Sequence, residues 1–240
     1  TSEWMATSCQ PIKKTRYVDK DFNKKLFDVY SAREIDLCPE LREDFRARLQ
    51  EAVGLSDVIV LNDFGHGLMG QYERDIVENA GFLALNCQTN AGNYGFNLVT
   101  KYANADYICI DDPEARLAAG MQREPMSQVV LKIAKRMTWH NFLITHGKFG
   151  SVNFTNVKAN STEFGYASSN HPALVAGGID TMGAGDAVMA VTAPLVAADL
   201  QLSLAAFVGN IVGAIKVSII GHRRHVGREE IIQTVEALLA

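Results

Sequence analysis

Two aspartates flank a glycine-alanine-glycine turn at residues 179–188, which read Ile-Asp-Thr-Met-Gly-Ala-Gly-Asp-Ala-Val. Small residues at the start of a helix leave main-chain N–H groups free, and these donors bind anions together with the helix dipole. A carboxylate beside such a cradle, here Asp186, can accept the proton of an attacking hydroxyl. The pattern favours phosphoryl transfer to an alcohol. The alternative is a plain turn at Gly183 and Gly185 with Asp186 capping the helix.

The seven residues from Asp180 to Asp186 are similar to the Asp-Thr-x-Gly-Ala-Gly-Asp signature of the ribokinase-like (PfkB) carbohydrate kinases. The resemblance implies a kinase that uses ATP and Mg2+ to phosphorylate a sugar or a sugar phosphate. It also implies that Gly183, Ala184 and Gly185 hold the transferred phosphate and that Asp186 is the catalytic base. Asp180 is a candidate for contact with the substrate.

A second glycine-containing segment, Thr-His-Gly-Lys-Phe-Gly at residues 145–150, follows an apolar stretch. A β-turn explains its two glycines without any ligand. Its place ahead of the Gly-Ala-Gly motif matches the Thr-x-Gly-x-x-Gly nucleotide segment of the family. The resemblance therefore implies that Thr145, Gly147 and Gly150 contact ATP.

Asn210 lies in an otherwise apolar helical stretch, residues 207–214. A buried asparagine needs hydrogen-bond partners, so a core residue bonded to the backbone is one interpretation. The resemblance instead implies that Asn210 lies beside the adenine and that Gly213 leaves room for the base.

The acidic segment Asp-Asp-Pro-Glu at residues 111–114 can cap the helix that follows it, since acidic residues favour the first helical turn. In the family this place holds Asn-x-x-Glu, which organises magnesium and phosphates. Glu114 matches that pattern and Asp111 replaces the asparagine, so both are candidate metal residues. Residues 222–225, His-Arg-Arg-His, read as a solvated loop, whereas in relatives this loop closes over the adenine and helps bind a monovalent cation such as K+.

A narrower resemblance rests on residues 62–67, Asn-Asp-Phe-Gly-His-Gly, and on Lys14-Thr-Arg16. These look most like the heptose-phosphate kinase half of the bifunctional ADP-heptose synthesis enzymes, and they make Asp63 a candidate substrate residue. His66 stands where lysine is expected.

Apolar runs that alternate with helical periods predict an α/β fold with a mostly parallel sheet covered by helices on both faces. Strands are expected at residues 57–61, 82–85, 107–110 and 141–145, with two further strands at 152–155 and 163–167. Helices are expected at residues 41–53, 71–79, 93–102, 113–119, 126–137, 184–198, 202–217 and 228–239. A hairpin of residues 15–18 and 25–29 is expected to be a lid over the sugar, which divides the chain into 1–32 and a nucleotide-binding core at 33–240.

The 240 residues carry a net charge of −4, with basic and acidic side chains well mixed, which argues against nucleic acid and membranes as partners. The four cysteines are widely spaced and indicate neither a zinc site nor a disulfide framework, so a cytoplasmic setting is expected. No P-loop, protein-kinase or dinucleotide signature is present.

The resemblance covers residues 13–240. The opening strand and the Gly-Gly-x-x-Asn region of full-length relatives are not found in this sequence. This leaves a second hypothesis open: a nucleotide-binding fragment, or a non-catalytic module without the sugar-binding part. In that case a homo-oligomer or a missing N-terminal segment would cover the exposed sheet edge.

Overall fold

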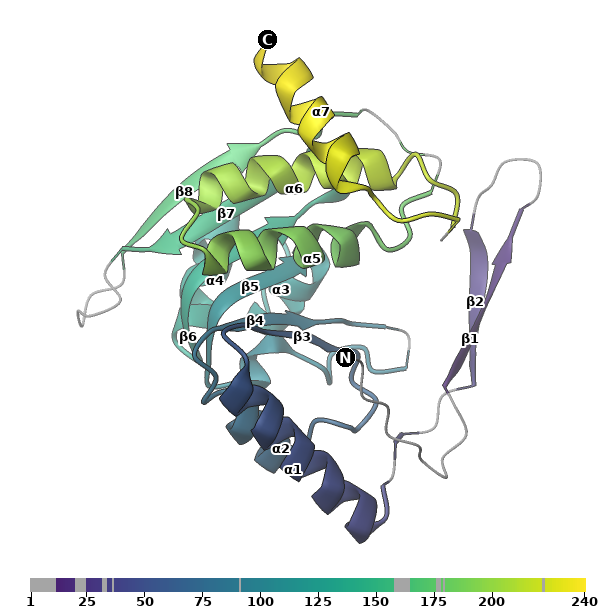
Figure 1. Ribbon diagram of the computed structural model, residues 1–240, viewed down its shortest axis with the longest axis vertical. Coiled ribbons are helices and arrows are strands. Elements are labelled where there is room, and N and C mark those ends of the chain that lie inside the picture. Colours follow the sequence, from purple (N-terminus) through teal and green to yellow (C-terminus); the bar gives the residue numbers. More distant parts are fainter. Residues whose placement is uncertain are drawn as a thin grey trace.

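The computed structural model of the chain contains a six-stranded sheet with helices on both faces, and a separate hairpin (Figure 1). The residues that it describes are 12–19, 25–31, 34–35, 37–90, 92–157, 165–175, 178, 180–221 and 223–240. Within this part of the chain, no helix is both long enough and apolar enough to cross a bilayer.

The large sheet has the strand order β3-β4-β5-β6-β7-β8. Its parallel strands are β3 (Ile59–Asp63), β4 (Leu83–Cys87), β5 (Asn104–Asp111) and β6 (Thr138–Thr145). Two antiparallel strands, β7 (Ser151–Asn156) and β8 (Tyr166–His171), complete it. Every residue of β4 is buried, as expected for a parallel strand with helices on both faces. The predicted α/β architecture is confirmed.

Alternate side chains of the central strands belong to two different cores. On β5, Ile108 and Ile110 pack with α3 (Asp112–Ala119) and α4 (Met126–Ala134), and Tyr107 and Cys109 pack with α5 (Ala184–Ala197) and α6 (Leu202–Lys216). This alternation is the period of two that places successive strand residues on opposite faces. The helices α5 and α6 thus cover one face of the sheet, and α5 begins at the Gly-Ala-Gly motif.

Ion pairs connect two helices near the edge strand β3. The side chains of Arg42 and Arg46 on α1 (Pro39–Leu55) both reach the buried carboxylate of Glu73 on α2 (Gln71–Val77), at 3.3 and 2.8 Å. The last helix, α7 (Arg228–Leu239), follows α6 and has no buried residue. The helix α1 has no buried residue either, but its Leu49 and Val53 pack against the larger core.

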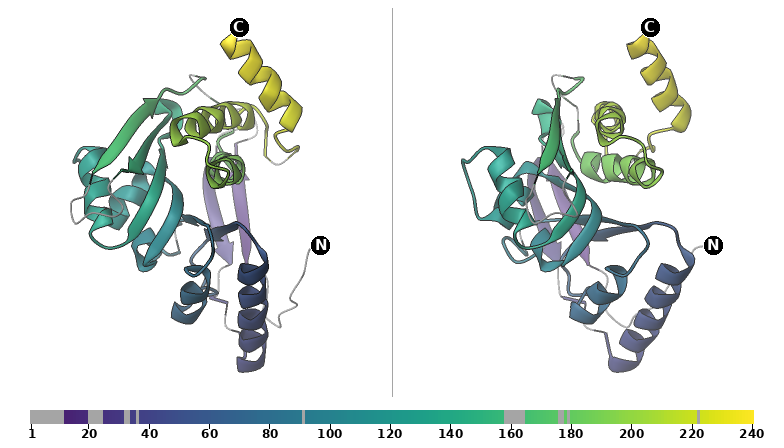
Figure 2. Two further views of the ribbon diagram at one scale, coloured as in Figure 1. Left: turned by 60° about the vertical axis from the view of Figure 1, so that its left-hand side comes forward. Right: turned by 90° about the vertical axis from the view of Figure 1, so that its left-hand side faces the viewer.

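The predicted hairpin is present as β1 (Lys13–Val18) and β2 (Lys25–Ser31), paired antiparallel. Tyr17 and Phe27 stack on one face, with ring centroids 4.5 Å apart, and Arg16 bonds Asp28 on the other. Figure 1 shows the hairpin standing apart from the large sheet, and in both views of Figure 2 the purple hairpin lies behind the rest of the chain. Residues 1–11 and the hairpin turn at 20–24 lie outside the described residues, and the division at residue 32 stays a prediction.

One predicted helix is wrong. In place of a helix at 93–102 the chain forms turns and a short 3-10 helix, η1 (Val99–Lys101). The side chain of Asn93 donates to the Phe64 carbonyl at 2.9 Å, and that of Asn97 donates to the Asp63 carbonyl at 2.8 Å. Asparagine side chains compete with helical hydrogen bonds in this way. The last predicted strand also begins later, at Tyr166, and residues 163–164 are outside the described part.

Candidate active site

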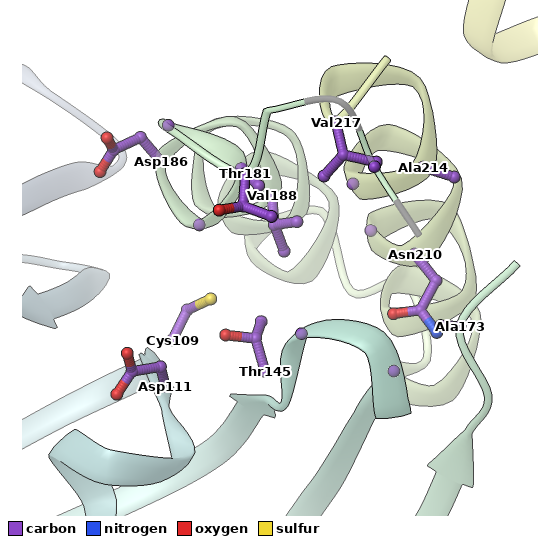
Figure 3. Close-up of a pocket in the computed structure, with 18 of the residues that line it drawn as sticks. Cys109, Asp111, Thr145, Ala173, Thr181, Asp186, Val188, Asn210, Ala214 and Val217 are labelled. Atoms are coloured by element: carbon purple, nitrogen blue, oxygen red, sulfur yellow. The ribbon is translucent and has the colours of Figure 1, made fainter. Parts of the chain in front are cut away.

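A cavity of about 390 Å3 lies between the carboxyl ends of β5 and β6 and the helices α5 and α6 (Figure 3). Ligands of open α/β sheets bind at this kind of position, beyond the carboxyl ends of the strands. Most of the site residues predicted from sequence line it, although they come from separate parts of the chain. They are Asp111, Glu114, Thr145, Gly147, Gly150, Gly183, Ala184, Gly185, Asp186, Asn210 and Gly213.

The helix α5 begins at the cavity. Gly183 precedes its first residue with φ +69°, a left-handed conformation that favours glycine, and no side chain caps the helix. Asp186 lies in the first turn and therefore does not play the capping role considered as the alternative. Since the first N–H groups of a helix have no acceptor within the helix, the start of α5 presents main-chain donors next to the Asp186 carboxylate. The N–H of Ala184 makes a long hydrogen bond, 3.3 Å, to the Thr181 carbonyl of the preceding loop. In Figure 3 that side chain extends away from the start of α5.

Gly185 differs from the other glycines of this helix pair. A Cβ added at Gly209 on α6 would come 2.9 Å from the Thr192 Cγ2 atom, so helix packing requires a glycine there. A Cβ added at Gly185 would have no neighbour within 4 Å, and one at Gly213 would make only an ordinary contact, 3.7 Å from Val188. Neither packing nor backbone strain explains Gly185. Its missing side chain keeps the cavity open at the helix start, which fits an anion such as phosphate.

Asp111 and Glu114 form a capping box at the start of α3. The Asp111 Oδ1 atom accepts the N–H of Glu114 at 2.8 Å, and the Glu114 Oε2 atom accepts the N–H of Asp111 at 2.9 Å. The other Glu114 oxygen accepts the N–H of Thr89 at 2.8 Å. The capping alternative is therefore realised, and the same two carboxylates also line the cavity.

The charged form of both carboxylates is disfavoured. Partial burial and, secondly, the charge of Asp111 raise the pKa of Glu114 to about 7. Asp111 is the more exposed of the two, and the loss of solvation at the cavity together with the charge of Asp112 raises its pKa. A hard cation with oxygen ligands would relieve this repulsion. Mg2+ commonly binds through one or two carboxylates together with substrate phosphates, and these two residues fit that role. Among the described residues there is no group of three or more metal-binding side chains that would hold a metal alone.

The loop after β6 turns sharply at two glycines. Gly147 has φ +51° and Gly150 has φ +91°, and a Cβ on Gly150 would overlap the carbonyl oxygen of His171. The N–H of His146 donates to the Gly150 carbonyl at 2.7 Å. A tight turn therefore accounts for both glycines, which line the cavity as a consequence of that turn.

Asn210 is engaged by the neighbouring strands. Its Oδ1 atom accepts the hydroxyl of Ser151 at 2.8 Å, and its Nδ2 atom donates to the carbonyls of His171 and Pro172 at 3.0 and 2.9 Å. These bonds tie α6 to the end of β8. They match the backbone-bonded interpretation of this asparagine, whose side chain also borders the cavity.

The profile of the pfkB family carbohydrate kinases matches residues 74–225, well over half of the chain. The chain belongs to this family. No curated protein sequence matches it significantly. The structure is similar to ribokinase from Giardia lamblia, with a TM-score of 0.66 and 19% identity over 93% of this chain and 70% of that one.

Two further solved structures have similar folds. Phosphofructokinase-2 from Escherichia coli in complex with potassium matches with a TM-score of 0.68 and 11% identity, over 89% of this chain and 67% of that one. Ribokinase from Thermotoga maritima matches with a TM-score of 0.65 and 16% identity, over 92% and 68%. Identities this low show the fold alone.

Two predicted substrate residues of this PfkB chain are not among the residues that line the cavity. The buried carboxylate of Asp63 accepts the Gly65 N–H at 2.9 Å and the Tyr102 hydroxyl at 2.6 Å, and it pairs with Lys101 at 2.5 Å. Asp180 accepts two main-chain N–H groups. Both carboxylates hold loops in place.

Some other residues at the cavity of this PfkB chain carry no recognisable signal in the sequence. Cys109 of β5 lines it, and in Figure 3 the sulfur extends toward the space below α5. Burial raises the pKa of this thiol to about 12, which keeps it protonated at neutral pH. Leu174 and Val175, beyond β8, supply an apolar wall.

In the predicted loop at 222–225, His222 is outside the described residues and Arg224 pairs with Glu230 at 2.7 Å.

Proposed function

We propose that this chain transfers the γ-phosphoryl group of ATP to a hydroxyl group of a sugar or sugar phosphate. The observation that carries the proposal is the start of α5, where main-chain donors without an acceptor inside the helix and the Asp186 carboxylate border one cavity. The donors of Gly183, Ala184 and Gly185 would stabilise charge on the transferring phosphate. Asp186 would accept the proton of the attacking hydroxyl.

The remaining cavity residues have roles that follow from their positions. Asp111 and Glu114 would hold Mg2+ against the phosphates, and the metal would neutralise charge on the γ-phosphate. Thr145, Gly147 and Gly150 would border the phosphates. Asn210 and Gly213 of α6 would border the adenine, beside the apolar residues beyond β8.

For the acceptor, we propose sugar phosphates of the heptose-phosphate type as the first class to test. The support is the resemblance of residues 62–67 to the heptose-phosphate kinases and the basic residues of the hairpin, where Lys14 and Arg16 flank Asp28 at 3.7 and 2.9 Å. Two cations around one carboxylate leave net positive charge, which suits an anionic acceptor. Asp63 and Asp180 are assigned to loop support.

The test is γ-phosphoryl transfer from Mg·ATP to a panel of pentoses, hexoses and heptoses, each with and without a phosphate group. We expect one acceptor class to be phosphorylated, and we expect Asp186→Asn to reduce turnover by about 100-fold or more. Nucleotide binding by this variant, measured by calorimetry, should persist because the cradle is intact. Turnover by Asp186→Asn at the wild-type rate would refute the role of the base. Nucleotide binding without transfer to any acceptor would favour the non-catalytic module.

A further inference from the structure

A buried lysine lies at the end of α6, and it is not among the residues that line the cavity. Lys216 is the last residue of the helix and is only 5% exposed. Lysine is almost never fully buried unless it is paired, because removal of an ammonium group from water is costly. A cation in this position therefore calls for an explanation.

The ammonium of Lys216 holds one residue of the following loop. Its Nζ atom donates to the carbonyl of Gly221 at 2.9 Å, and the N–H of Gly221 donates to the Oδ2 atom of Asp180 at 2.7 Å. Gly221 has φ +57°, which favours glycine. Both polar groups of this residue are thus fixed by charged side chains, one cationic and one anionic.

Asp180 carries the connection to the anion cradle. Its Oδ1 atom accepts the N–H of Met182 at 3.0 Å, and its own N–H donates to the carbonyl of Val217 at 3.0 Å. The next residue after Met182 is Gly183, which begins the cradle. A continuous set of hydrogen bonds therefore links the Lys216 ammonium to the loop that opens α5.

We propose that Lys216 is a positioning residue, whose ammonium acts as a built-in monovalent cation that holds the cradle loop in its phosphate-binding conformation. This inference rests on the proposed function. The Asp180 oxygens and the Gly221 carbonyl, which would be natural ligands for a free cation, already have donors. A relative was solved in complex with potassium, but in this chain the lysine would supply the charge. The activity should then be independent of added K+.

The simpler role for Lys216 is a favourable charge at the carboxyl end of a helix. Lys135 offers a matched control, because it follows the last residue of α4 directly and is exposed. Both lysines lie at the carboxyl end of a helix, but only Lys216 is connected to the cradle. Replacement of each by methionine separates the two roles.

The experiment is calorimetric titration of the full chain with Mg·AMP-PCP, in potassium chloride, ammonium chloride or tetramethylammonium chloride. We expect the wild type and Lys135→Met to bind equally well in all three salts. Lys216→Met should bind about tenfold more weakly in the tetramethylammonium salt, within the usual range for coupled sites. Potassium or ammonium should restore its affinity to within about threefold of the wild type, since a small cation can enter the space left by the ammonium.

Rescue by a small cation is an effect that a merely structural lysine would not show. Equal affinity of Lys216→Met and wild type in all salts would overturn the inference, as would a loss that no cation restores. Should Lys216→Met fail to melt cooperatively, Lys216→Gln decides the same question, since it keeps an N–H donor and loses the charge. No binding by folded wild type in any salt would instead overturn the proposed function.

Discussion

Replacement of Gly185 by alanine is predicted to stabilise the fold and to weaken nucleotide binding at the same time. An added Cβ meets no protein atom within 4 Å, and Gly185 is the second residue of α5. Alanine is favoured over glycine in helices by up to about 1 kcal/mol, and by less near the ends. We therefore expect a gain of about 0.5 kcal/mol, which raises the melting temperature of a chain of this size by roughly 1–2 °C.

The same Cβ would occupy the space where the phosphate is proposed to lie. Loss of one preorganised donor to a developing anion costs about 3–4 kcal/mol in other enzymes, and a methyl group in the cradle should have an effect of similar size on phosphoryl transfer. The assay pairs thermal unfolding with calorimetry of Mg·ATP and with the rate of phosphoryl transfer from Mg·ATP. Gly54→Ala is the control, because Gly54 is also helical and free of neighbours but lies in α1. If Gly185→Ala is destabilised, or binds Mg·ATP as tightly as Gly54→Ala does, the reasoning about this glycine is wrong.

Three further predictions test residues around the site. Gly150→Ala should lose about 3 kcal/mol or more of unfolding free energy, because the Cβ would overlap the His171 carbonyl at a left-handed φ, and an unchanged melting temperature would contradict this. Glu114 has its pKa raised from 4.5 to about 7, so its contribution to stability is present below pH 4.5 and is lost as the pH rises through 7. As the pH rises between those limits, the unfolding free energy of Glu114→Gln should increase by about 1–2 kcal/mol relative to that of the wild type, after allowance for partial exposure. Urea unfolding without metal measures this difference, and equal pH dependence of the two proteins would exclude the effect. Asp63→Asn should lose about 2–4 kcal/mol of unfolding free energy because Lys101 is left without its carboxylate partner, while the KM for the acceptor stays constant; a higher acceptor KM without loss of stability would restore Asp63 to the substrate site.

The parallel core could be predicted because its strands are continuous apolar runs. Residues 82–85 and 107–110 read as buried strands, and β4 and β5 contain them almost entirely. The helix predicted at 93–102 is wrong because hydrogen bonds to remote parts of the chain decide the local structure. Its asparagines bond to the carbonyls of Phe64 and Gln88, which belong to other parts of the chain, and no local pattern reveals those partners.

The cavity could be predicted where short motifs fix the backbone, as at Gly183 and Gly150. The partners of charged side chains could not. Asp63 follows a strand and reads as a substrate residue, yet it is buried against Lys101 and Tyr102, which are remote in sequence. Lys216 would be expected at the surface, and only the fold of the loop after α6 shows that it is buried. Tertiary contacts of this kind leave no periodic signal in the chain.

The most direct test of the central claim is a crystal structure of this chain with Mg·AMP-PCP. The account predicts that the terminal phosphate lies on the main-chain donors of Gly183, Ala184 and Gly185, within reach of Asp186. It also predicts Mg2+ between the phosphates and Glu114. A nucleotide bound elsewhere, or one whose phosphates point away from the start of α5, would contradict the proposed phosphoryl transfer.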